Sequence, residues 1–426
     1  MLKTIRWKIG FLMFLGILIN YLDRVNISQS IIEIPKSFPL TEVQKGWVMS
    51  AFFTGYVLMM MIGGYVVFKK GARKTLTAAT ILLAFASTAC GLSFGFVSLL
   101  VFRFLIGVFE APVYPAFASV TGRWFPKQER VKAIGLFDIG SYAGIGFATL
   151  VIAWVITAFN WRTSFIFSGV LTLVWSIVWY CYFRDDPAMH PRISRQEVYA
   201  ITAGTQQQVL TKAPLLKFIA HKKVIGISIG FFCFNYLKSF YLTWLPTYLV
   251  KEKGLQLLSS GIIAATPIIF AILGEIATAV IIDRLIAKGH NATRVKKTPV
   301  CLGMMLSTII IFSLFTSNIY AIVALLTLSY IFLVSASVSI WSIPEELAQS
   351  KSEIAIIGSI QNTFSNISGI VAPVVTGYLY AKSGSFLWPF IVSVMVSIAG
   401  SISYWFIAGR LTFIHFNKQP AGTASC

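Results

Sequence analysis

Charged residues are scarce in this chain of 426 residues: they make up 12% of it, while hydrophobic residues make up 57%. An ordinary soluble domain has about 25% charged residues. The composition therefore excludes a string of soluble domains and indicates a protein that is solvated by lipid. Acidic residues are especially few, with 15 against 35 lysines and arginines. The net charge of +20 would suggest nucleic acid in a soluble protein, but the basic residues lie between apolar segments. We therefore read the charge as membrane orientation and expect no nucleic-acid partner.

Cysteine and histidine are also scarce, and their positions exclude further kinds of site. The five cysteines show no paired spacing and no CxxC motif, so neither a disulfide framework nor a metal site is indicated. The four histidines fall in loops or at a helix end: His190, His221, His290 and His415. A proton carrier within the membrane must then be a carboxylate. We expect no cofactor, with protons as the coupling ion and sodium as an open alternative.

Long apolar runs are what the chain has instead. A membrane-spanning helix needs about 20 mostly apolar residues, and twelve such segments are predicted: 9–30, 46–67, 75–95, 98–121, 132–155, 162–183, 223–249, 259–281, 298–316, 319–342, 354–379 and 385–408. The long polar stretch 184–222 divides them into an N-terminal six-helix bundle, 1–183, and a C-terminal one, 223–426. We predict an all-α membrane protein of two pseudo-symmetric bundles joined by a cytoplasmic loop.

The basic residues also predict the topology. Most of the 35 lysines and arginines fall in the loops on one side of the membrane, which is the cytoplasmic side in membrane proteins. Both termini and the loop 184–222 are therefore expected in the cytoplasm. Repeated six-helix halves are a transporter architecture, with the substrate bound near the midplane between them.

Ionisable residues inside the apolar segments are the candidates for chemistry, because each costs about 2.5–3.5 kcal/mol in the membrane. Asp23 and Arg24 lie deep in the first segment. Arg103 and Glu110 lie seven residues apart in the fourth, which puts them on about the same helix face. Arg24 can hold a substrate carboxylate bidentately, and a carboxyl in apolar surroundings can load and release a proton. The alternatives are that Arg103 and Glu110 neutralise each other or pair across helices to fix packing, or that Asp23 and Arg24 form a structural pair.

Three further ionisable residues are less certain candidates. Lys238 in the seventh segment is assigned to the central cavity, with snorkelling to the interface as the alternative. Asp138 in the fifth is either part of the site or a helix-end charge. Glu275 in the eighth either pairs with a loop cation or takes a direct role.

Twelve helices in two halves resemble the major facilitator superfamily. The loop after the second segment, Gly64-x-x-x-Phe68-Lys69-x-Gly71-x-Arg73-Lys74, is similar to that superfamily's Gly-x-x-x-Asp-Arg-x-Gly-Arg-Lys pattern. Phe68 replaces the acidic residue, so the charge latch of the N-terminal half is in doubt. The resemblance implies gating roles for Gly64, Gly71, Arg73, Asp283 and Arg284, with Asp283 supplying the equivalent contact in the C-terminal half.

Six motifs in order make the chain more specifically similar to the anion:cation symporter family, whose members take up sugar acids, hexuronates and phthalate. They are Asn20-Tyr21-x-x-Arg24-x-Asn26-x-Ser28, Arg103-x6-Glu110-Ala111, Arg123-Trp124-Phe125-Pro126-x-x-Glu129-Arg130, Asp186-Pro187-x-x-His190-Pro191, Trp244-x-Pro246-Thr247-Tyr248-Leu249 and Ser368-Gly369-Ile370-Val371-Ala372-Pro373.

This resemblance implies roles for individual residues. Asp23 and Glu110 match the proton-carrying carboxylates, Arg24 the anion-binding arginine, and Arg103 the arginine coupled to the carboxylate of the fourth helix. Further substrate contacts are expected from residues of both halves: Tyr21, Tyr56, Ser141, Tyr142, Lys238 and Asn362, with Asp138, Trp244 and Trp341 as possible additions. Ser141 replaces the family's usual amide, which argues against assuming a sugar acid.

Lys238 is a second departure from the family. Organophosphate:phosphate antiporters place an arginine six residues before the same Trp-x-Pro-Thr-Tyr-Leu motif. Two cations across the cleft suit a dianion or a larger anion.

The sequence therefore predicts a proton-coupled symporter that takes up an organic anion such as a sugar acid or a di- or tricarboxylate. It is expected to be a monomer in the lipid bilayer of a bacterial inner membrane. The alternatives are a phosphate-type anion exchanger and an organic-anion exporter. An enzyme or receptor is not expected, since the longest loop has no catalytic set and no phosphate-binding glycine loop.

Overall fold

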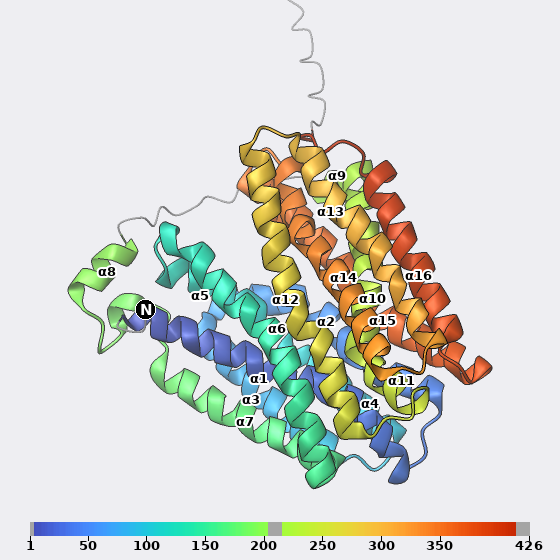
Figure 1. The fold of residues 1–426 in the computed structure, drawn as a ribbon. Helices are drawn as coiled ribbons and strands as arrows, with labels where there is room; N and C mark the ends of the chain where they lie inside the picture. The colour runs from blue at the N-terminus through green and yellow to red at the C-terminus, as the bar shows by residue number, and fades with distance from the viewer. Residues whose placement is uncertain (1–3, 203–214, 415–426) are drawn as a thin grey trace, which may run out of the picture.

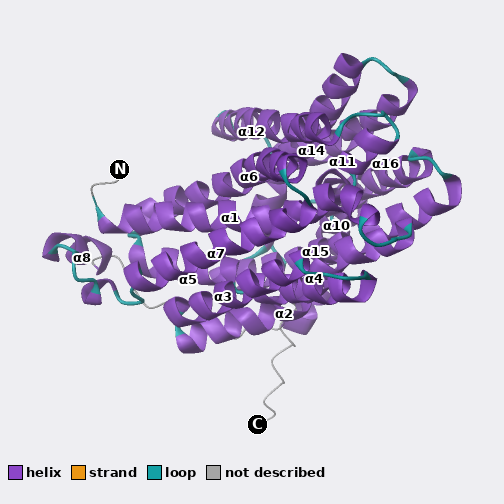
Figure 2. Cartoon of the chain, turned by 90° about the horizontal axis from the view of Figure 1, so that it is seen from below, coloured by secondary structure: helices purple, strands orange, loops and turns teal. Residues whose placement is uncertain are grey.

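The described part of the chain is helical throughout, without strands. A computed structural model describes residues 4–202 and 215–414, and Figures 1 and 2 show its helices joined by short loops. The N-terminal half consists of α1 Ile5–Glu33, α2 Glu42–Lys70, α3 Ala72–Gly91, α4 Phe96–Glu110, α5 Val113–Trp124, α6 Lys127–Ala158 and α7 Trp161–Tyr182. Short helices follow in the connection, α8 Arg195–Thr202 and α9 Leu215–Ile219. The C-terminal half consists of α10 Lys222–Thr243, α11 Leu245–Lys251, α12 Leu257–Ala287, α13 Ala292–Leu306, α14 Ile319–Leu347, α15 Lys351–Ser383 and α16 Leu387–Ile402.

Four predicted segments differ from the observed helices. The segment 98–121 is divided into α4 and α5 by a turn at Ala111 and Pro112. The segment 223–249 is broken at Trp244, because Pro246 lacks an N–H and starts the new helix α11 near its first turn. After α13 the chain tightens into a 3-10 helix, Ser307–Phe315, and after α16 into a π-turn, Ser403–Ile407.

Eleven of the described helical stretches are long and apolar enough to cross a membrane. The helix α15, which contains the predicted eleventh segment, is not among them, although its 33 residues are sufficient in length. Its central part contains the polar residues Gln361, Asn362, Ser365 and Asn366. Such polar groups are expected to face the protein interior rather than lipid.

Side-chain caps and glycines end several helices. Thr41 and Gln44 form a capping box at the start of α2, which satisfies two otherwise unpaired N–H groups. The side chain of Asn160 caps α7 by accepting from the backbone N–H of Thr163. Gly384 ends α15 with a φ of 66°, a left-handed conformation that glycine adopts without steric cost.

Close helix crossings position the interior of the N-terminal half. At Gly107 a Cβ would lie 1.9 Å from the carbonyl oxygen of Phe52, and at Gly55 it would lie 2.2 Å from that of Phe104. Only glycine allows α2 and α4 to approach this closely. The crossing brings Phe52 and Tyr56 of α2 alongside the polar residues of α4.

The two halves meet at one face of the molecule and diverge at the other. The main contacts between them join α2 to α15, α6 to α12, and α1 to α10 and α11. Figure 1 shows the helix ends near the N-terminus and α8 spreading away from those of α9 and α13. We call this diverging face the N-terminal face, and the other, which carries Glu42 and Lys251, the closed face.

Backbone contacts and one ion bridge hold the closed face together. Gly46 of α2 lies so near α15 that a Cβ would stand 2.6 Å from the carbonyl oxygen of Pro373. Beside it, Glu42 accepts hydrogen bonds from Lys45 at 2.9 Å and from Lys251 of α11 at 2.5 Å. Lys251 therefore ties the C-terminal half to α2.

Replacing Gly46 by alanine is expected to open the closed face. A clash with backbone atoms disfavours this state by about 1–3 kcal/mol, roughly a 5- to 150-fold shift between states. Spin labels at Lys36 and Lys382 in a cysteine-free background should report a larger population of long distances. The matched control is Gly358→Ala on α15, where a Cβ meets nothing within 4 Å. Identical distance distributions for Gly46→Ala and the control would contradict the role of this contact.

Candidate functional site

A buried ion pair lies at the centre of the N-terminal half. Nε of Arg24 on α1 donates to Oε1 of Glu110, the last residue of α4, at 2.5 Å. Only 11% of the Arg24 side chain and 2% of the Glu110 side chain are exposed. The helix α4 ends at Glu110, and Ala111 and Pro112 separate it from α5. The carboxylate is therefore held at a helix end.

Aromatic rings enclose the guanidinium of Arg24. Its Cζ lies 5.1 Å from the ring centres of Tyr21 and Phe52 and 5.0 Å from that of Tyr56, within the range of cation–π attraction. Nη2 of Arg24 and Oε2 of Glu110 are buried without a hydrogen-bond partner among the described residues. The pair is thus enclosed but incompletely satisfied, which leaves the arginine able to bind a second acceptor.

Asp23 is separated from this ion pair. It is fully buried, and its carboxylate accepts from the hydroxyls of Ser87 at 2.5 Å and Thr172 at 3.3 Å. Arg103 is buried nearby and donates from Nη1 to the backbone carbonyl of Asp23 at 3.0 Å. A structural pair of Asp23 with Arg24 is therefore not what this conformation shows.

Arg103 also differs from the expected coupling to Glu110. Within the described residues it makes no hydrogen bond to that carboxylate, and its Nε has no partner. Its Cζ lies 5.3 Å from the ring centre of Phe52. Both residues were expected on one helix face, but Glu110 has Arg24 of α1 as its partner.

Hydroxyl groups continue from this centre toward the C-terminal half. Tyr114 of α5 shares a 2.8 Å hydrogen bond with Ser141 of α6. The adjacent Tyr142 donates to Glu275 of α12 at 3.4 Å, and Ser337 of α14 donates to the same oxygen at 3.1 Å. Tyr142 therefore connects the two halves through Glu275.

Glu275 lies among hydroxyl groups in the interior. It pairs with no loop cation among the described residues and instead has two hydroxyl partners. It is the only acidic residue of its apolar segment, a signal that alone would have marked it. Lys238 also lies here, with Nζ 5.5 Å from the centre of the Tyr142 ring.

The remaining predicted substrate contacts occupy different positions. Asn362 donates weakly to Sδ of Met60 at 3.9 Å and accepts from Asn366 at 3.2 Å, so it lies where α2 meets α15. Trp341 is 58% exposed and packs edge-on against Phe231.

Trp244 lies apart from the polar groups. It is fully buried, and its indole donates to the carbonyl of Pro373 at 3.1 Å. It therefore fastens the break between α10 and α11 to α15, which is a packing role. The side chain of Asp138 lies outside the described residues.

The loop between α2 and α3 is contacted by an acidic residue from elsewhere in the chain, while Phe68, at the family's acidic position, is exposed. Asp185, after α7, accepts from the backbone N–H of Ala72 at 2.7 Å and of Arg73 at 3.1 Å. Gly71 has a φ of 82°, and a Cβ there would meet this carboxylate at 2.6 Å. The guanidinium of Arg73 donates to the carbonyl of Tyr180. The N-terminal half thus caps α3 with a residue distant in sequence.

The other predicted gating residues are less engaged. Asp283 and Arg284 are exposed, and Asp283 forms no ion pair within the described residues. Gly64 lies near the Pro115 ring, where a Cβ would have ordinary contact at 3.8 Å.

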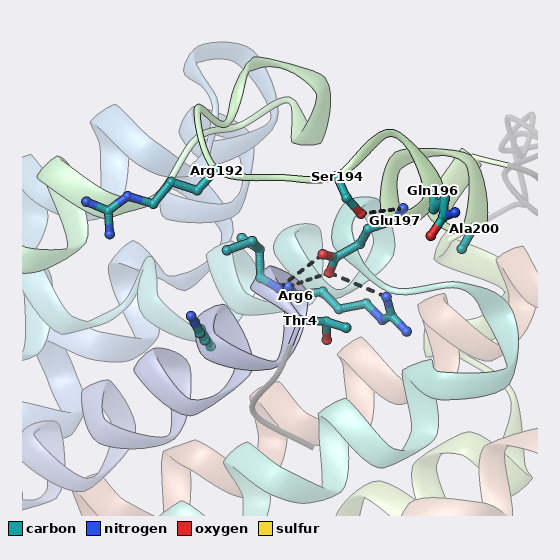
Figure 3. Close-up of a pocket in the computed structure, with 9 residues that line it drawn as sticks. Thr4, Arg6, Arg192, Ser194, Gln196, Glu197 and Ala200 are labelled. Carbon is teal, nitrogen blue, oxygen red and sulfur yellow. Dashed lines mark hydrogen bonds and ion pairs between the residues drawn. The ribbon is translucent and has the colours of Figure 1, made fainter.

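A separate pocket lies at the start of α1 on the N-terminal face (Figure 3). Its lining includes Arg6 and Glu197. Glu197 of α8 accepts from the backbone N–H groups of Ile5 and Arg6, so the carboxylate caps the first turn of α1. Arg6 also pairs with Glu129 at 2.7 Å. These contacts anchor α8 and are apart from the Arg24 centre.

The described histidines lie outside the membrane-spanning helices. His190 and His290 lie in connections, and His221 caps α10; His415 is outside the described residues. Burial lowers the pKa of His190 and of His221, which keeps both neutral near pH 7. Within residues 4–202 and 215–414, no group of three metal-ligating side chains gathers.

Comparison with known proteins decides the family. The model of the Major Facilitator Superfamily matches residues 13–355. The chain belongs to this superfamily. It is a multi-pass membrane transporter and not an enzyme.

Relatives of full length support this assignment. The chain is 30% identical to the D-galactonate transporter of Escherichia coli O6:H1, over 93% of this chain and 94% of that protein. It is 28% identical to a probable galactarate/D-glucarate transporter of Bacillus subtilis, over 98% and 94%. Among solved structures, a bacterial homologue of the human lysosomal transporter Spinster superposes with a TM-score of 0.77 at 16% identity, covering 95% of this chain and 96% of that one. The last comparison concerns the fold alone.

Replacing Asp185 by alanine tests the new cap. Two N–H groups of α3 would lose their acceptor, which should lower the free energy of unfolding by about 1 kcal/mol. The measurement is the midpoint of thermal unfolding in detergent. Asp283→Ala is the matched control and should leave the midpoint unchanged, because Asp283 is exposed. Equal midpoints for the two variants would refute the cap.

Proposed function

We propose that this transporter carries an organic acid anion into the cytoplasm together with protons, by alternating access. The single observation that supports this most is the ion pair of Arg24 with Glu110. It puts an internal carboxylate on the cation best suited to bind the carboxylate of a substrate. The names of the relatives, transporters of galactonate and of galactarate and glucarate, favour the same class of substrate.

Competition for Arg24 would couple the two events. A proton on Glu110 removes its negative charge and frees the guanidinium for the substrate anion. Loss of that proton restores the carboxylate, which recaptures Arg24 and displaces the anion. The aromatic rings of Tyr21, Phe52 and Tyr56 exclude water and strengthen both interactions. Asp23, whose carboxylate accepts from the hydroxyls of Ser87 and Thr172, is proposed as a second proton carrier.

The conformation is consistent with release on the inside. The excess of basic residues in the loops of the N-terminal face favours a cytoplasmic location for that face. The divergence of the helices there and the contacts of Gly46 and Lys251 at the closed face then correspond to an inward-facing state. A bacterial inner membrane is the proposed location, and a monomer is the proposed unit.

Purified protein in liposomes that contain a pH-sensitive dye tests this proposal. The anions added outside are D-galactonate, D-glucarate, a tricarboxylate and an organophosphate. The carboxylates should acidify the interior of the liposomes. Glu110→Gln should reduce the rate of acidification at least tenfold. It should retain counterflow of labelled anion, since glutamine is uncharged at every pH and so resembles a permanently protonated carboxyl.

Glu33→Gln is the matched control, because Glu33 ends α1 and, among the described residues, pairs only with Lys36 nearby. Counterflow without acidification in the unaltered protein would refute proton coupling and favour an anion exchanger. Transport only when the anion starts inside would favour an exporter.

A further inference from the structure

A second charged group faces the interior from the C-terminal half, beyond the Arg24 centre. Nζ of Lys238 on α10 lies over the ring of Tyr142, 5.5 Å from its centre. Oε1 of Glu275 accepts from the hydroxyls of Tyr142 and Ser337. The charges of Lys238 and Glu275 lie within electrostatic reach of each other.

The two charges nevertheless do not form a contact ion pair. Within the described residues, neither Nζ of Lys238 nor Oε2 of Glu275 has a hydrogen-bond or ion-pair partner. Both side chains are half-buried, so one ammonium with three donors and one carboxylate oxygen stay free in partly dry surroundings. A lysine and a glutamate held apart in this way can receive a group between them.

The chemistry of the pair selects that group. A lysine ammonium only donates hydrogen bonds and an ionised carboxylate only accepts them, whereas a hydroxyl does both. A second carboxylate of the substrate would be attracted by Lys238 but repelled by Glu275. An amine would meet the opposite conflict. A neutral hydroxyl can accept from Lys238 and donate to Glu275 at once.

Polar residues of α5 and α6 lead from the Arg24 centre toward this pair. Tyr142 follows Ser141, whose hydroxyl is bonded to Tyr114. The ring centre of Tyr21 lies 5.1 Å from Cζ of Arg24. Polar side chains therefore run from the arginine to the pair in the C-terminal half.

We propose that Lys238 and Glu275 form a hydroxyl-binding subsite that selects polyhydroxy monocarboxylates over dicarboxylates. The inference rests on the proposed function, because Arg24 is taken to hold the carboxylate. It revises the expectation that Lys238 calls for a dianion, since Glu275 supplies a compensating negative charge. Because Tyr142 belongs to one half and Glu275 to the other, a bound hydroxyl would join both halves.

Equilibrium binding to the purified full-length protein, by isothermal titration calorimetry in detergent at fixed pH, tests the subsite. The probes are D-galactonate with hydroxyls and one carboxylate, D-glucarate with hydroxyls and two, and hexanoate with no hydroxyl. The unaltered protein should bind D-galactonate in preference to both. Glu275→Gln should weaken D-galactonate about tenfold, through loss of a charge-assisted hydrogen bond, and strengthen D-glucarate.

Further variants make the outcome specific. Lys238→Gln should weaken D-galactonate and D-glucarate alike, and Glu33→Gln should change neither. Glutamine can keep the hydrogen bonds from Tyr142 and Ser337, so Glu275→Gln is expected to fold, which its thermal midpoint checks. A galactonate-to-glucarate affinity ratio unchanged by Glu275→Gln would overturn the subsite.

Failure of the subsite and of the proposed function are distinguishable. If D-galactonate binds and Arg24→Gln abolishes binding, but the ratio ignores Glu275, then only the subsite is wrong. If no probe binds and Arg24→Gln has no effect, then the organic-acid function and the subsite fall together.

Discussion

The ion pair of Arg24 and Glu110 is the interaction on which the interior of this transporter depends. Two charges that are almost completely enclosed in protein need each other, because leaving one of them uncompensated costs about 3–5 kcal/mol. The pair joins the middle of α1 to the break between α4 and α5. It therefore links the charge of Glu110 to the position of a helix end. Separating the pair needs a proton on Glu110 and an anion on Arg24, so that neither charge is left uncompensated.

The surroundings of the pair explain how it is kept in place. Glycines at the crossing of α2 and α4 let the aromatic rings of Phe52 and Tyr56 reach the guanidinium. Asp23 and Arg103 are held beside it by hydroxyls and by a backbone carbonyl, not by each other's charges. The N-terminal half thus carries four ionisable groups in one core, with only one direct ion pair among them.

The C-terminal half contributes a different chemistry. Lys238 and Glu275 are separate charges on either side of Tyr142, whose ring faces Lys238 and whose hydroxyl donates to Glu275. The backbone contact of Gly46 with α15 holds the halves together at the closed face. An anion that bridges the two halves would meet a strong, enclosed cation on one side and a weaker, balanced pair on the other. This asymmetry is the basis for reading one end of the substrate as a carboxylate and the other as polyhydroxy.

Hydropathy and the placement of charges are properties of short stretches of chain, and the sequence alone determined what depends on them. These are the membrane helices, the long connection between two sets of helices, and the embedded residues Asp23, Arg24, Arg103 and Glu110. Lipid excludes charge wherever a segment lies, so these residues stand out without knowledge of their partners.

Partners depend on how helices rotate and cross, and only the tertiary structure decided them. Glu110 pairs with Arg24 of α1 and makes no hydrogen bond with Arg103 on its own helix, a difference that the spacing within one helix does not reveal. Asp185 takes the place of the acid missing at Phe68, since the end of α7 reaches the start of α3. Glu275 meets Tyr142 across the two halves, a relation between residues 133 positions apart that no local pattern encodes.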